Sequence, residues 1–211
     1  MDAIIISWTD SGNIESASAS NPLIVLLHGY GSNEHDLPGL VSWLGVDYPW
    51  VSLRAPFALQ QGGFAWFPIT TPLKPSANDV RMATDAVWQW LDNRVDSSVP
   101  LLVIGFSQGG LMTTQLLRTR PECLIRTAVL AGFVAESAQA ADAELAEARP
   151  DVFWSRGTAD TVISDEAHER TRRVLGELTT LHEKVYPGLG HSVDERVLAD
   201  LREYVNGASS H

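Results

Sequence analysis

A ten-residue stretch, Leu101 to Gly110, constrains the fold of this chain more than any other. It reads L-L-V-I-G-F-S-Q-G-G, an apolar run typical of a buried strand followed by Gly-x-Ser-x-Gly and a helical spacing of apolar residues. A strand, a turn and a helix are therefore expected to meet at Ser107. Glycine at positions 105 and 109 removes the Cβ atoms that would collide in so sharp a turn. Ser107 would then project from the strand end, beside the free N–H groups of a helix N-terminus.

Strands and helices alternate along the chain after residue 20. The strands are expected over residues 3–8, 23–27, 51–53, 101–106, 127–130, 152–154 and 181–186. The helices are expected over residues 36–46, 78–95, 108–119, 138–148, 164–178 and 193–205. This alternation predicts an α/β fold with a mostly parallel, doubly wound sheet and helices on both faces. In such sheets the ligand site lies at the carboxyl ends of the strands, so residues directly after the strands are the functional candidates.

The chain of 211 residues is long enough for one substantial core. We expect a single domain over residues 1–206, followed by a frayed tail over 207–211. The segment 7–21 is polar and is expected to be a loop or hairpin. The segment 57–76 has no clear period, is rich in glycine, proline and aromatic residues, and is expected to be a functional loop.

Composition excludes several kinds of partner. The formal net charge is −11, and such a surface repels phosphate backbones and anionic lipids, so nucleic-acid binding is not expected. The single cysteine, Cys123, permits no intrachain disulfide and fits a reducing compartment. The N-terminal residues have no basic segment and no h-region, and no apolar run approaches the ~18 residues of a membrane span. We therefore expect neither a signal peptide nor a membrane span.

A serine hydroxyl becomes a good nucleophile when a neighbouring base takes its proton, and histidine suits this task because it titrates near neutrality. The chain has six histidines: His28, His35, His168, His182, His191 and His211. Of these, only His191 follows both Ser107 and the last expected strand in a loop flanked by glycine. His191 is the predicted base; the alternative is a loop histidine that caps the last helix.

An acid is needed to orient the histidine and to stabilise its imidazolium form. Asp160 lies between Ser107 and His191 in the sequence, in the segment Gly157-Thr158-Ala159-Asp160 into which the expected strand 152–154 runs. Asp151 precedes that strand and would lie at the wrong edge of the sheet. Asp160 is therefore the predicted acid; the alternative is a solvated loop aspartate.

Two N–H groups are needed to stabilise an oxyanion. The backbone N–H of Gln108 follows the serine directly. The second donor is expected in the loop after the strand 23–27, at the backbone N–H of Tyr30 or a neighbour within His28-Gly29-Tyr30-Gly31. The alternative for this loop is a plain glycine turn.

The chain resembles the phospholipase/carboxylesterase family of α/β-hydrolases over nearly its whole length. The matching motifs are L-H-G-Y-G (27–31), R-A-P (54–56), A-W-F (65–67), G-F-S-Q-G-G (105–110), G-T-A-D (157–160) and G-L-G-H-S (188–192). The resemblance implies an α/β-hydrolase fold and a serine esterase that cleaves acyl esters or thioesters, with a Ser107-Asp160-His191 triad and oxyanion donors at Tyr30 and Gln108. It also implies a cytoplasmic location and allows for homodimers.

Two positions depart from the thioesterase branch of this family. That branch usually has an aspartate after the Trp-Phe pair, where this chain has Pro68, and its H-G-L-G-D is H-G-Y-G-S here. Both differences weigh against protein deacylation more than against hydrolase chemistry.

The substrate is expected to enter an open site. The connection between the expected strands 127–130 and 152–154 is too short for a large helical lid. The loop 57–76 is then the expected acyl wall, contributed by Phe64, Trp66 and Phe67 and extended by Ile69 and Leu73; the alternative is a local core under the loop. Val162 and Leu189 flank the predicted acid and base and would narrow the acyl slot.

The sequence thus predicts a carboxylesterase that hydrolyses short- to medium-chain acyl esters through an acyl-enzyme on Ser107, without a metal ion or cofactor. One alternative keeps the fold and changes the substrate, as in an acyl-protein thioesterase or lysophospholipase. Another keeps the triad and changes the reaction, to perhydrolysis or lyase chemistry. A third, from another class, is a non-catalytic α/β-hydrolase-like binding module.

Overall fold

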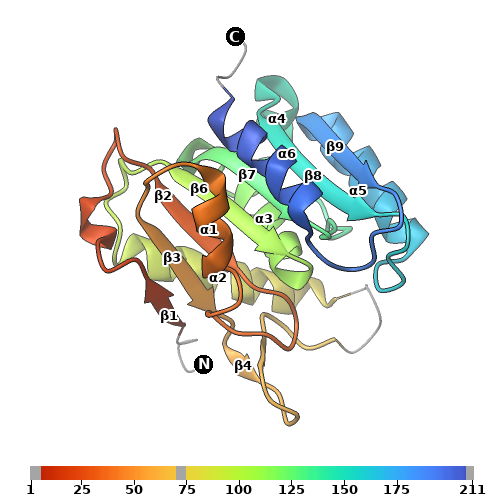
Figure 1. Cartoon of the computed structure of the whole chain (residues 1–211), viewed down its shortest axis with the longest axis horizontal. Helices are drawn as coiled ribbons and strands as arrows, with labels where there is room; N and C mark the ends of the chain where they lie inside the picture. The colour runs from red at the N-terminus through yellow and green to blue at the C-terminus, as the bar shows by residue number, and fades with distance from the viewer. Residues whose placement is uncertain (1–5, 70–74, 208–211) are drawn as a thin grey trace.

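The computed structural model of the chain describes residues 6–69 and 75–207. Its central sheet has seven strands in the order β1-β3-β2-β6-β7-β8-β9 (Figure 1). These strands are β1 (Ser7–Asp10), β2 (Leu23–Leu27), β3 (Trp50–Arg54), β6 (Leu101–Phe106), β7 (Leu124–Leu130), β8 (Asp151–Gly157) and β9 (Thr180–Tyr186). β1 runs antiparallel to β3, and the other neighbours pair in parallel. The predicted mostly parallel sheet is therefore confirmed.

Within the described residues, six α-helices cover the two faces of this sheet. They are α1 (Pro38–Leu44), α2 (Ala77–Asp92), α3 (Gln108–Leu117), α4 (Asp142–Ala148), α5 (Asp165–Leu178) and α6 (Glu195–Asn206). Two 3-10 turns, η1 (Ile14–Ser16) and η2 (Pro121–Cys123), lie in the connections. Figure 1 shows α1 and α6 side by side on the near face of the sheet, while α2 and α3 lie behind it.

The side-chain pattern of β2 explains the two layers of core. Leu23, Val25 and Leu27 join the cluster under α2 and α3, whereas Ile24 and Leu26 join the cluster under α1 and α6. All five side chains are fully buried. Because successive strand residues point to opposite faces, a strand covered on both sides must be apolar at every position.

The ends of several elements differ from those predicted. β1 extends to Asp10, so it takes up part of the segment expected to be a loop, while residues 1–5 lie outside the described part of the chain. α1 begins at Pro38 with Leu37 at its N-cap, and Asp36 provides no cap. Ser164 caps α5, because its Oγ accepts a hydrogen bond of 3.2 Å from the N–H of Ala167.

The loop expected over residues 57–76 contains a short antiparallel hairpin. Its strands are β4 (Phe57–Ala58) and β5 (Phe64–Ala65), which pair with each other, and Phe64 also forms an isolated bridge with Ser32. Leu73, expected in the acyl wall, lies outside the described residues. The connection between β7 and β8 holds only the short helix α4, so no large lid is evident in the described part of the chain. Nor does that part include a helix long and apolar enough to cross a membrane.

Candidate active site

Ser107 lies in the sharp turn between β6 and α3, as the glycine pattern predicts. Its backbone has φ 55° and ψ −115°, a strained conformation for a residue with a side chain. A Cβ atom on Gly105 would come within 2.2 Å of the carbonyl oxygen of Gly109, and one on Gly109 within 1.9 Å of that of Leu27. Both glycines are therefore required for the helix to approach the strands so closely.

Three side chains distant in the sequence form a continuous hydrogen-bonded chain. Ser107 Oγ lies 2.8 Å from His191 Nε2, and His191 Nδ1 lies 2.8 Å from Asp160 Oδ2. Ser107 follows β6, Asp160 follows β8 and His191 follows β9, so all three come from the carboxyl ends of parallel strands. This edge of the sheet is where sequence analysis placed them.

The environment of Asp160 favours the charged carboxylate. Its side chain is fully buried, and burial by itself would raise its pKa. The hydrogen bond from His191 and two backbone N–H groups, those of Val162 at 2.8 Å and Ile163 at 3.1 Å, outweigh burial and lower the pKa of Asp160 below its ordinary value. An ionised Asp160 holds His191 with Nδ1 protonated, which leaves Nε2 free to accept the serine proton.

Backbone hydrogen bonds join the two loops that carry Asp160 and His191. The N–H of Thr158 donates to the carbonyl of Tyr186 at 3.0 Å, and the N–H of Ala159 donates to that of Leu189 at 2.9 Å. The hydroxyl of Thr158 accepts from the N–H of Gly188 at 2.9 Å. The loops of the predicted acid and the predicted base are therefore joined to each other by hydrogen bonds.

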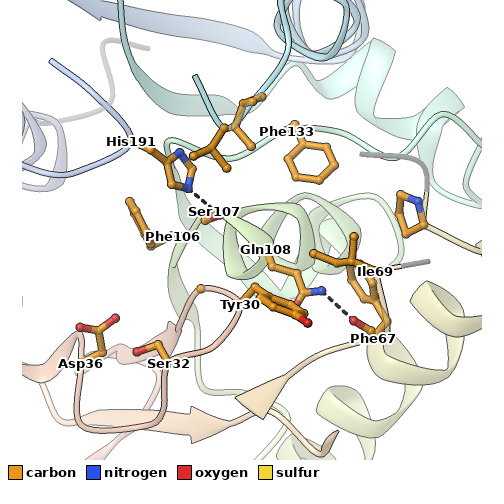
Figure 2. Close-up of a pocket in the computed structure, with 14 residues that line it drawn as sticks. Tyr30, Ser32, Asp36, Phe67, Ile69, Phe106, Ser107, Gln108, Phe133 and His191 are labelled. Atoms are coloured by element: carbon orange, nitrogen blue, oxygen red, sulfur yellow. Dashed lines mark hydrogen bonds between the residues drawn. The ribbon is translucent and has the colours of Figure 1, made fainter. Parts of the chain in front are cut away.

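The loop after β2, residues 28–32, lies beside Ser107 and carries the predicted oxyanion donor Tyr30 (Figure 2). We call this segment the oxyanion loop. His28 fastens the start of this loop, because its Nδ1–H donates to the carbonyl of Gly29 at 2.7 Å and its Nε2 accepts from the N–H of Ala55 at 3.0 Å. Burial lowers the pKa of the His28 imidazole. Farther along, the buried carboxylate of Glu34 accepts two hydrogen bonds from the guanidinium of Arg54, which lower its pKa.

Gln108 begins α3, so its backbone N–H has no partner within the helix. Its side chain makes two hydrogen bonds that sequence analysis did not predict. Oε1 accepts a hydrogen bond of 2.8 Å from the N–H of Trp66, and Nε2 donates one of 2.9 Å to the carbonyl of Phe67 (Figure 2). The Trp66 indole also donates to the carbonyl of His28 at 2.9 Å. The loop after β5 is therefore joined both to the turn that carries Ser107 and to the loop after β2.

A cavity of about 260 Å³ opens at Ser107. It is lined mainly by apolar groups, among them Phe67, Ile69, Pro75, Phe106, Phe133, Val162 and Ile163. Phe67 and Val162 thus lie where sequence analysis expected substrate contacts. Ile69, Phe133 and Ile163 line the same cavity. Phe133 is among the candidates that follow a strand, here β7, but no motif indicated its role, and Ile163 was not predicted.

Three other residues expected at the acyl wall lie elsewhere. Trp66 is fully buried, with its indole N–H bonded to the backbone of the oxyanion loop. Phe64 stacks under the guanidinium of Arg54, whose carbon lies 4.6 Å from the ring centroid. Leu189 is buried in the core beneath α1 and α6. Phe64 and Trp66 thus fit the alternative of a local core under the loop, and Leu189, expected to narrow the acyl slot, packs in the core instead. None of the three is among the described residues that line the cavity.

Within residues 6–69 and 75–207, no three His, Cys, Asp or Glu side chains are grouped so that they could hold a metal ion.

A mostly parallel sheet with a serine on a strained strand-to-helix turn, followed in the chain by an acid and a histidine, defines the class of α/β-hydrolases. Residues 11–209 match the family described as Phospholipase/Carboxylesterase, and the chain belongs to this family. It is a carboxylic ester hydrolase.

Relatives and solved structures agree with this assignment. A probable carboxylesterase of rice (Oryza sativa subsp. japonica) is 28% identical over 214 residues, covering 90% of this chain and 79% of the relative. Carboxylesterase SOBER1 of Arabidopsis thaliana is 32% identical over 107 residues, covering 50% of this chain and 47% of SOBER1. The crystal structure of the Bacillus cereus carboxylesterase has a TM-score of 0.78 at 21% identity, covering 95% of this chain and 92% of that one. The crystal structure of a carboxylesterase from Mesorhizobium loti has a TM-score of 0.79 at 17% identity, covering 99% of this chain and 97% of that one. At these identities the two structures establish the shared fold.

Proposed function

We propose that the protein is a serine carboxylesterase in which Ser107 is the nucleophile, His191 the general base and acid, and Asp160 the acid that orients His191. One observation carries this proposal: the unbroken chain of two 2.8 Å hydrogen bonds from Ser107 through His191 to a buried aspartate. A binding module would have no need of such a chain at the end of a strained turn.

The reaction follows from these positions in two steps. Ser107 Oγ attacks the ester carbonyl while its proton passes to His191 Nε2, and the carbonyl oxygen takes up negative charge between the N–H groups of Tyr30 and Gln108. His191 then gives the proton to the departing alkoxide, which leaves as the alcohol. Water attacks the acyl-enzyme in the second step; its proton passes to His191 and on to Ser107 as the acid is released.

The preferred substrates in this proposal are esters of short- to medium-chain acids. The cavity of about 260 Å³ is below the ~300–1,000 Å³ of sites that enclose drug-sized ligands, and its walls are apolar. Phe67 and Val162 contact the acyl chain. Cytoplasmic location and assembly into homodimers remain predictions from the family resemblance.

Two experiments test the proposal. Ser107→Ala should lower kcat on p-nitrophenyl butyrate by roughly 10³-fold or more and abolish labelling by a fluorophosphonate probe. A loss below tenfold would exclude Ser107 as the nucleophile, and an unlabelled wild-type protein would favour the binding module.

In a series of p-nitrophenyl esters, kcat/KM should peak at or below about eight carbons. A continued rise beyond that length would contradict the short-chain preference and favour the thioesterase or lysophospholipase alternative.

A further inference from the structure

A second groove of about 420 Å³ adjoins the cavity at Ser107. It runs from His191 and Phe106 between α1 and the start of α6, and its apolar lining comes from Leu37, Leu40, Trp43, Val193 and Leu198. The two hollows share Asp36, Phe106 and His191 as lining residues, so they are continuous. The function proposed above uses only the first of them.

The position of the groove relative to the reacting atoms indicates what it holds. It is lined by His191 but by none of Ser107, Tyr30 and Gln108, which line the cavity. Figure 2 shows His191, Phe106 and Asp36 to one side of Ser107, with Phe67, Ile69 and Phe133 to the other. A bound ester therefore has two separate directions in which to extend from the serine.

The chemistry of the triad assigns the two directions. His191 Nε2 must protonate the departing oxygen, so the alcohol part of the ester has to lie on the His191 side. The acyl part then extends past the oxyanion donors into the cavity lined by Phe67. From this we infer that the groove between α1 and α6 binds the alcohol of the substrate, and that this alcohol is apolar and uncharged. The inference rests on the proposed function, because it uses His191 as the acid.

Charge and exposure in the groove support this choice of alcohol. Asp36 is the charged side chain at the junction of the two hollows, and among the described residues no lysine or arginine lines the groove. A carboxylate at this position repels an anionic alcohol. Trp43 presents 48% of its surface to solvent, which is unusual for so large an apolar side chain and leaves its ring available to a ligand.

Three butyrate esters test the inference, because they form the same acyl-enzyme and differ only in the alcohol: methyl butyrate, hexyl butyrate and the butyrate of 6-hydroxyhexanoate. Since kcat/KM reports the steps up to release of the alcohol, it measures what the groove contributes. For the wild type we expect kcat/KM to be highest for the hexyl ester and lower for the ester with the anionic alcohol. Trp43→Ala should reduce the hexyl-to-methyl ratio of kcat/KM by about tenfold.

Two control variants make the result specific. Trp8→Ala removes another exposed tryptophan, on the edge strand β1, and should leave the hexyl-to-methyl ratio unchanged. Ile69→Ala alters the cavity and should change the preference for acyl length without changing this ratio. An unchanged ratio in Trp43→Ala, or a wild-type preference for the anionic alcohol, would overturn the inference. The failure of the proposed function is distinguishable, because Ser107→Ala would then retain activity on all three esters.

Discussion

Gln108 has two roles, one for its backbone N–H and one for its side-chain amide. Its backbone N–H faces the position of the oxyanion in the proposed mechanism, while its side chain binds the backbone of Trp66 and Phe67. The carbonyl of Phe67 and the N–H of Trp66 are buried, so each would lose its partner if the amide were removed. The position of the cavity wall at Phe67 therefore depends on the side chain of Gln108, which follows Ser107 in the turn.

Gln108→Ala should lower the free energy of unfolding by about 1–3 kcal/mol for each buried group left unpaired, and it should raise KM more than it lowers kcat. The reason is that the variant keeps the backbone N–H but releases the wall that contacts the acyl chain. Urea unfolding and steady-state kinetics on p-nitrophenyl butyrate measure the two effects. Gln115→Ala is the matched control, because Gln115 is buried on the same helix and its Oε1 has no hydrogen-bond partner within the described residues. An equal change of KM in both variants would contradict this role for Gln108.

The sequence predicted where the chemistry-bearing residues lie but not the role of the Gln108 side chain. Ser107, Asp160 and His191 each lie in the loop or turn after a strand, and parallel strands end at one edge of the sheet. The partners of Gln108 are backbone groups more than forty residues away in the chain. Every residue has such groups, so no pattern of residue types could indicate which ones the amide would reach.

The hairpin of β4 and β5 supports the oxyanion loop through its backbone. The N–H of Gly31 donates to the carbonyl of Phe64 at 2.9 Å, and the N–H of Phe64 donates to that of Ser32 at 2.8 Å. The turn of the hairpin ends at Gly63, which has φ +75°. A Cβ atom at this position would lie 1.9 Å from the carbonyl oxygen of Gly31, next to the predicted donor Tyr30.

Gly63→Ala should therefore displace the oxyanion loop and reduce kcat, with a loss approaching the 10²–10³-fold that follows removal of one oxyanion donor. Gly62→Ala is the matched control: Gly62 also has a positive φ, of +93°, but a Cβ atom there would meet nothing within 4 Å. Both variants incur the cost of a left-handed alanine, and only Gly63→Ala adds the collision. Similar kcat values for the two variants would show that the hairpin does not hold the oxyanion loop in place.

Elements were predicted most accurately where burial alone decides them. β2 and β6 match the expected ranges because a strand covered on both faces needs an uninterrupted apolar run. Helix ends and the hairpin were predicted less well. Asp36 resembles an N-cap in sequence, but its place at the mouth of the cavity depends on tertiary packing. β4 and β5 have two residues each, too few to produce an alternating pattern.

At the scale of the whole molecule, stability should depend on two buried histidines. Burial lowers the pKa of His28, and burial together with the charge of Arg156 lowers that of His168. The unfolded chain takes up a proton at each position below about pH 6.5, whereas the folded chain resists it. Because the unfolded state then binds more protons, the contribution of each histidine to the free energy of unfolding depends on pH. It is fully present above pH 6.5 and is lost as the pH falls through the pKa that the histidine has in the folded protein. Each histidine contributes a slope of up to about 1.4 kcal/mol per pH unit in this range.

The net charge of −11 acts in the opposite direction, because protonation on acidification relieves repulsion across the folded surface. The wild-type pH profile alone would therefore mix two effects, and a comparison of variants separates them. We expect the free energy of unfolding of His28→Gln, measured in urea between pH 5.5 and 7.5, to depend less steeply on pH than that of the wild type. Gln115→Ala, which removes no titratable group, should keep the wild-type slope. The carboxylates with lowered pKa, such as Asp160 and Glu34, titrate below this range and do not disturb it. If the free energy of unfolding varied with pH in the same way for the wild type and His28→Gln, the prediction would be wrong. The His28 imidazole would then take up its proton as readily in the folded protein as in the unfolded chain.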